Sequence, residues 1–172
     1  MNNFIIISIS ILVIIALYNA IVLIILRSVW KRILHLEWEI IESFFSKVNK
    51  IPAVVEIMKR YTRHPDIFED IIYLHKMWII YNIESIYDLL DLNQRIHREF
   101  QFLMKLSAKI PELHRDGNFL YIRSYVIFYE NQVERKIWEI NAFLHSYNKL
   151  IKIKNISIFG FLFSIKEKNV IW

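Results

Sequence analysis

The chain has 172 residues and a formal net charge of +5, from 22 Lys and Arg against 17 Asp and Glu, which is the length of one ordinary domain. It has no cysteine, and this excludes a disulfide, a thiolate nucleophile, a zinc ribbon and an iron–sulfur cluster. Only 2 glycines and 3 prolines are present, so a β-sandwich, a glycine-loop nucleotide fold and a disordered chain are unfavourable, and an all-α fold is expected.

The first predicted element is a single N-terminal transmembrane helix over residues 4–26, preceded by a short extracytoplasmic segment, residues 1–3. The helix contains no charged residue, and a bilayer core requires about 20 apolar helical residues. No basic side chain precedes it and no small-residue cleavage motif follows, so we expect an uncleaved anchor. Asn19 predicts one of three arrangements: contact with the helix of another copy, a position near the headgroups, or a bond to its own backbone.

A basic collar follows the predicted span directly and consists of Arg27, Lys31 and Arg32, with Lys47 and Lys50 a few turns further on. Basic residues flanking a membrane helix are retained on the cytoplasmic side. The pattern therefore predicts a single-pass protein of the cytoplasmic (inner) membrane, with the N-terminus outside and the C-terminal domain in the cytoplasm.

Residues 27–153 are predicted to form a helical bundle into which the membrane helix continues. Apolar residues first recur at helical spacing along one stripe, which we expect to be buried: Trp30, Leu34, Trp38, Ile41, Phe45 and Val48. Pro52 removes a backbone donor, so we expect a kink or a restart of the helix there, with Asn49 as its cap.

Three further helical segments are expected after Pro52. Pro65 and Asp66 suit the start of the first, whose buried side is predicted to be Ile67, Ile71, Leu74, Trp78 and Tyr81. A break at residues 82–85 or 88–93 precedes a segment whose apolar face contains Ile96, Phe100, Leu103 and Ser107. Pro111 and Gly117 bracket a loop.

The last predicted helix covers about residues 118–153. Its apolar side comprises Ile122, Val126, Tyr129, Val133, Ile137, Ile140, Leu144 and Tyr147. The long segments and short connections favour an elongated antiparallel bundle of three or four helices. Residues 154–172 depart from this pattern, because an uncharged ten-residue stretch at 156–165 lies between lysines. It is too short to span a bilayer, so it predicts either an interfacial membrane contact or a strand-like flap over one end of the bundle.

Two motifs resemble the LemA family: IPAVVEIMKRY at residues 51–61 and IPELHRDGNF at residues 110–119. The positions that match the family pattern are Ile51, Pro52, Tyr61, Pro111, Asn118, Phe119, Glu130, Asn131, Tyr147, Asn148 and Lys166. The resemblance implies an N-terminal membrane helix followed by a mainly helical cytoplasmic bundle. One branch of the family belongs to the proteins that build magnetosome membranes, so the resemblance also suggests a role in membrane organisation.

Sequence signatures of catalysis are absent. No histidine stands three residues after a glutamate, as carboxylate-bridged metal sites in bundles require, and HExxH, GxSxG and GxxxxGK do not occur. His35 and Glu39 share a helix face and are interpreted as a surface pair. The other histidines show no ligand spacing and are interpreted as structural: His64, His75, His97, His114 and His145. We therefore expect no catalytic, cofactor-binding or metal-binding residue.

The leading functional hypothesis is a membrane-anchored, non-enzymatic helical scaffold or adaptor that binds membrane lipid and either protein partners or copies of itself. No nucleic acid or small-molecule substrate is expected, because the strongest basic cluster adjoins the membrane span, where anionic lipid is the nearest partner. The alternative is a self-assembling, membrane-shaping protein. An enzyme with an unfamiliar site is a third hypothesis, which a deep polar pocket with converging titratable groups would favour.

Overall fold

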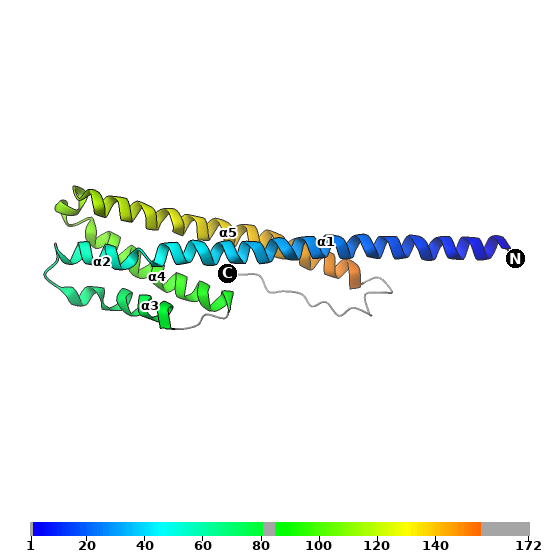
Figure 1. The fold of residues 1–172 in the computed structure, drawn as a ribbon, viewed down its shortest axis with the longest axis horizontal. Coiled ribbons are helices and arrows are strands. Elements are labelled where there is room, and N and C mark those ends of the chain that lie inside the picture. The colour runs from blue at the N-terminus through cyan, green and yellow to red at the C-terminus, as the bar shows by residue number, and fades with distance from the viewer. Residues whose placement is uncertain (1, 81–84, 156–172) are drawn as a thin grey trace. The chain divides into compact units, whose positions relative to one another are not determined.

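The computed structural model describes residues 2–80 and 85–155. Within these ranges the chain is all-α, as predicted, with five α-helices, two short 3₁₀ helices and no strand (Figure 1). The elements are α1 (Asn2–Val48), α2 (Ile51–Lys59), η1 (Pro65–Phe68), α3 (Glu69–Ile80), α4 (Ile86–Ser107), η2 (Pro111–His114) and α5 (Gly117–Asn155). The predictions for the tail from residue 156 onward, including Lys166, lie outside the described residues.

Proline explains the first helix boundary. α1 ends at Val48 and α2 begins at Ile51, so Pro52 falls in the first turn of α2, where its missing N–H needs no partner. The predicted restart is confirmed. The predicted cap is wrong, because Lys50 and not Asn49 occupies the N-cap position, and no side chain bonds the free amides there.

The later helices begin where the sequence offers a suitable residue. Pro65 opens η1, which leads into α3. α4 starts at Ile86, and the Ser85 hydroxyl caps it by accepting a hydrogen bond from the Tyr87 amide at 3.2 Å. Residues 88–93 therefore lie inside α4, and a break at that position is wrong.

By their contacts, the described residues group into two compact units, residues 2–36 with 138–155 and residues 37–80 with 85–137. In the described part of the first unit, the Trp30 and Tyr147 rings lie 5.5 Å apart, and Arg32 lies 3.9 Å from Glu139. The Asn19 amide donates to the Ile15 carbonyl at 2.7 Å, which confirms the bond to its own backbone.

The N-terminal part of α1 is long and apolar enough to cross a membrane, with a mean hydropathy of 3.0 over an 18-residue window. Only 11% of that window is buried. A core helix of a soluble protein would be mostly covered, so the segment is compatible with a single membrane anchor.

The second unit contains the C-terminal part of α1, the N-terminal part of α5, and α2, η1, α3, α4 and η2 between them. α1 and α5 run antiparallel within it, because Glu39 pairs with Lys136 and Lys47 pairs with Glu130. The fully buried side chains of this unit include Ile40, Phe44, Val54, Met58, Phe68, Ile71, Ile96, Leu103, Leu113, Phe119, Val126 and Val133. The face predicted for α4 and most of that predicted for α5 are thus confirmed.

The apolar stripe predicted for α1 is buried only in part. Val48 is fully buried, but Trp38 and Phe45 are 66% and 51% exposed, whereas Ile40 and Phe44, outside the stripe, are fully buried. Phe44 packs edge-on against Trp78 of α3, with ring centroids 4.9 Å apart. The helix carries apolar residues on more than one face, so periodicity alone identifies an apolar stripe without telling which stripe the neighbouring helices cover.

Candidate functional site

The centre of the second unit contains a buried cation. The Lys47 side chain is 1% exposed, and its ammonium donates to Glu130 Oε2 at 2.5 Å and to Asn93 Oδ1. Lys47 comes from the last turn of α1, Asn93 from α4 and Glu130 from α5. One polar cluster therefore joins three helices inside the core of this unit.

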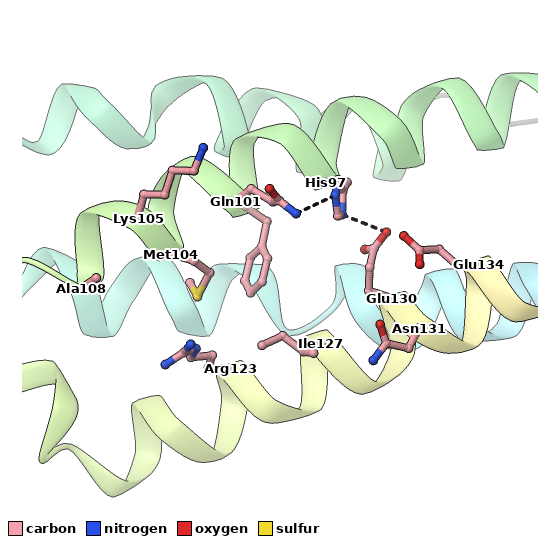
Figure 2. Close-up of a pocket in the computed structure, with 11 residues that line it drawn as sticks. His97, Gln101, Met104, Lys105, Ala108, Arg123, Ile127, Glu130, Asn131 and Glu134 are labelled. Carbon is pink, nitrogen blue, oxygen red and sulfur yellow. Dashed lines mark hydrogen bonds and ion pairs between the residues drawn. The ribbon is translucent and has the colours of Figure 1, made fainter.

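Glu130 connects this cation to a histidine on its other side. His97 of α4 places Nδ1 3.1 Å from Glu130 Oε1. The opposite ring nitrogen of His97, Nε2, lies 3.0 Å from the Gln101 side-chain amide one turn further along α4. Figure 2 shows these two contacts in line, with Glu134 beside Glu130 one turn along α5. The two oxygens of Glu130 therefore face different partners, Lys47 on one side and His97 on the other.

A pocket of about 630 Å³ opens between α4 and α5 at this cluster. Its polar end holds His97, Glu130 and Glu134, and its lining also includes Phe100, Gln101, Met104, Lys105, Ala108, Arg123, Ile127 and Asn131 (Figure 2). The apolar members form a surface between the carboxylates and the basic residues. Such a mixed pocket with a few convergent polar groups is typical of a ligand site.

Burial and charge act in opposite directions on Lys47. Removal from water lowers the pKa of its ammonium below the usual value, because desolvation penalises the charged form, while the carboxylates of Glu130 and Glu134 partly oppose this by favouring the charged form. By formal charge, Lys47, Glu130 and Glu134 together carry −1 at this end of the pocket, while Lys105 and Arg123 belong to the rest of its lining.

The positions that match the family pattern are distributed over the molecule. Glu130 and Asn131 lie at the pocket. Ile51 and Phe119 are buried. The family positions Tyr61 and Phe119 both donate to the Asp116 carboxylate, the Phe119 amide at 3.0 Å and the Tyr61 hydroxyl at 3.2 Å. Pro52 lies in α2, Pro111 lies in η2, and Asn118 lies in the first turn of α5. Tyr147 and Asn148 lie in the first unit.

The collar residues Arg27, Lys31 and Arg32 are exposed on α1 and belong to the first unit. Lys47, which had been counted with the basic residues near the membrane, is instead buried. Glu39, which shares a helix face with His35, forms an ion pair with Lys136 at 2.9 Å. The partners Glu130 and Lys136 come from α5, and spacing within α1 carries no information about them.

Sequence reasoning missed Lys47, His97 and Glu134 as members of a site. This group does not follow the Glu-x-x-His spacing, because two glutamates four residues apart share one face of α5 and the histidine comes from α4. The Glu130–Glu134 spacing was the available signal, since residues at i and i+4 are neighbours on a helix. His97 could not be assigned to it without the packing of α4 on α5.

No curated protein and no solved structure matches the chain. The sequence model of the LemA family matches residues 37–171, which is most of the chain. The match includes the whole second unit with Lys47, His97, Glu130 and Glu134. It also agrees with the two motifs and the all-α fold. The chain therefore belongs to the LemA family.

Proposed function

We propose that the protein is a membrane-anchored, non-enzymatic helical scaffold or adaptor that organises protein partners at the cytoplasmic membrane. The observation that carries this proposal is the continuity of α1. Its first turns are apolar and exposed, its last turns are part of a packed helical unit, and no residue between Asn2 and Val48 leaves the helix. Anchoring one end of such a protein would concentrate its binding surfaces at the bilayer.

Membrane anchoring is tested by extraction. The full-length protein is expected to stay in the membrane fraction after alkaline carbonate treatment, and a variant lacking residues 4–26 is expected to be released. Release of the intact protein would contradict an anchor.

The proposed orientation rests on Arg27, Lys31 and Arg32, which follow the apolar segment and are exposed. Of two reporters fused after Trp172, we expect activity from the type that works in the cytoplasm and none from the type that works outside it. Activity of a reporter that requires the outer side of the membrane would reverse the assignment.

Exposed aromatic side chains support a partner-binding surface. On α5, Tyr121 and Phe128 are 67% and 54% exposed, and they belong to a run of rings whose neighbouring centroids lie 4.7 to 6.5 Å apart. Aromatic residues are enriched at protein interfaces, where they bury large rigid areas. We expect Tyr121→Ala with Phe128→Ala to reduce partner binding without unfolding the protein.

The decisive experiment is crosslinking of the tagged full-length protein in its own cells, followed by mild detergent extraction and quantitative mass spectrometry. One or two proteins recovered near equal stoichiometry, and lost from the double aromatic variant, would support the scaffold. Recovery of self-crosslinks and lipid alone would instead favour the alternative, a self-assembling membrane-shaping protein.

An enzyme is the second candidate, because the pocket brings His97, Glu130 and Glu134 together. We favour the scaffold because Glu130 is already paired with Lys47 and the pocket lining contains no hydroxyl or thiol nucleophile. Partner capture by a scaffold is expected to be unchanged in Glu134→Gln, which alters only this pocket. A reaction dependent on Glu134 in the purified protein would overturn the non-enzymatic assignment.

A further inference from the structure

Three side chains at the pocket have the composition of a metal site. His97, Glu130 and Glu134 each offer one ligand atom, and these atoms lie within 4.8 Å of one another. The two glutamates are one turn apart on α5, and the histidine approaches from α4 (Figure 2). Two helices thus supply one imidazole nitrogen and two carboxylate oxygens to the same small volume.

The orientation of Glu130 is fixed by a group that is not itself a ligand. Lys47 holds Oε2, so the remaining oxygen, Oε1, faces His97 at 3.1 Å. Outer partners that hold a ligand carboxylate in this way are a regular feature of metal sites. Glu130 is therefore preorganised, with one oxygen anchored by the protein and the other directed at the proposed ion.

His97 presents a ring nitrogen to the same small volume. Its Nδ1 is shielded from solvent and lies 3.1 Å from Glu130 Oε1. The other nitrogen, Nε2, lies 3.0 Å from the amide nitrogen of Gln101. A metal-bound Nδ1 requires the tautomer with the proton on Nε2, and Gln101 accepts that proton once its amide is turned so that the oxygen faces the ring.

The remaining requirements concern space and charge. Ligand atoms about 2.1 Å from a tetrahedral ion lie roughly 3.4 Å apart. The widest separation between the three ligand atoms must therefore shorten by about an ångström. Glu134 can make this movement because its side chain is exposed and not held by core packing. The pocket gives an ion access from solvent. The formal charge of −1 on Lys47, Glu130 and Glu134 favours a cation.

We propose that His97 Nδ1, Glu130 Oε1 and a carboxylate oxygen of Glu134 bind one divalent transition-metal ion, with water or a pocket ligand completing its coordination. Mixed imidazole and carboxylate ligands suit Zn²⁺, Mn²⁺, Fe²⁺ and Co²⁺ better than Mg²⁺ or Ca²⁺, which prefer oxygen ligands alone. The ion joins α4 to α5. This inference does not depend on the scaffold proposal, because it uses none of the apolar segment of α1.

The test uses the full-length protein in detergent micelles, freed of its tag and stripped with EDTA. ZnCl₂ and MnCl₂ are titrated separately by isothermal titration calorimetry into the wild type, Glu134→Gln and His97→Gln. Glu42→Gln is the matched control, because it removes an exposed carboxylate from the same unit outside the pocket. Far-UV circular dichroism establishes that each variant is folded.

We expect one ion per chain in the wild type and in the control. Loss of an outer partner alone typically weakens a metal site by about 10–100-fold, so loss of the ligand Glu134 is expected to weaken binding at least about 10-fold. Co²⁺ bound to the wild type should give a visible absorption spectrum that is lost from the folded Glu134→Gln variant. Absence of binding in the wild type, or equal binding in Glu134→Gln, would overturn the site.

Discussion

Removal of the buried cation provides the most direct test of the second unit. In Lys47→Met the side-chain volume is nearly kept, but Glu130 and Asn93, which are 9% and 7% exposed, lose the ammonium that pairs with both. A buried partner left without its counter-charge costs about 3–5 kcal/mol. This is a large fraction of the roughly 5–15 kcal/mol by which folded domains are stable.

A second substitution separates the charge from the packing. In the double variant Lys47→Met with Glu130→Met, no uncompensated charge remains, and replacing a buried pair by apolar residues is commonly neutral or stabilising. The double variant is therefore expected to be more stable than Lys47→Met alone. The two substitutions should show a coupling free energy of about 3 kcal/mol or more, which additive effects would not produce.

The assay is thermal unfolding of the full-length protein in detergent micelles containing EDTA, followed by far-UV circular dichroism. For a chain of this size, each 1 kcal/mol shifts Tm by about 2–4 °C, so Lys47→Met should unfold about 6–20 °C below the wild type. A loss under about 2 °C, or a double variant as unstable as the sum of the singles, would show that the ion pair is not buried in the folded protein.

Further substitutions test the packing and the helix start. Phe44→Ala should cost about 3–5 kcal/mol because the ring is fully buried, whereas Phe45→Ala, next to it but half exposed, should cost about 1 kcal/mol; equal losses by chemical denaturation would contradict the observed helix face. Asp116→Ala should lower Tm by a few degrees, because the carboxylate caps α5. The Phe119 amide holds the pKa of Asp116 below its usual 3.8, so the stabilisation is complete above about that pH and is lost as the pH falls through the lower pKa of the folded state. Asp116→Asn should keep part of the cap, and its Tm should fall less steeply than that of the wild type as the pH is lowered below 4; an unchanged slope would show that Asp116 does not contribute.

Much of the fold follows from the sequence alone. Pro52, Pro65 and Pro111 each stand in the first turn of a helix, since proline lacks the amide that an interior helical position needs. The apolar faces of α4 and of most of α5 agree with the predicted periodicity. The segment over residues 4–26 is a candidate membrane span by its length and composition, and neither property depends on a tertiary contact.

The tertiary structure decided which side of α1 is buried and where its lysine lies. Phe44 and Phe45 are chemically identical neighbours, and only the position of α3 and the other helices determines that the first is covered. Lys47 read by itself is another basic residue after the span, and its role depends on Glu130, 83 residues later in the chain. Periodicity is a local property, whereas burial and charge pairing depend on which helices meet, and the site at His97, Glu130 and Glu134 exists only where α4 packs on α5.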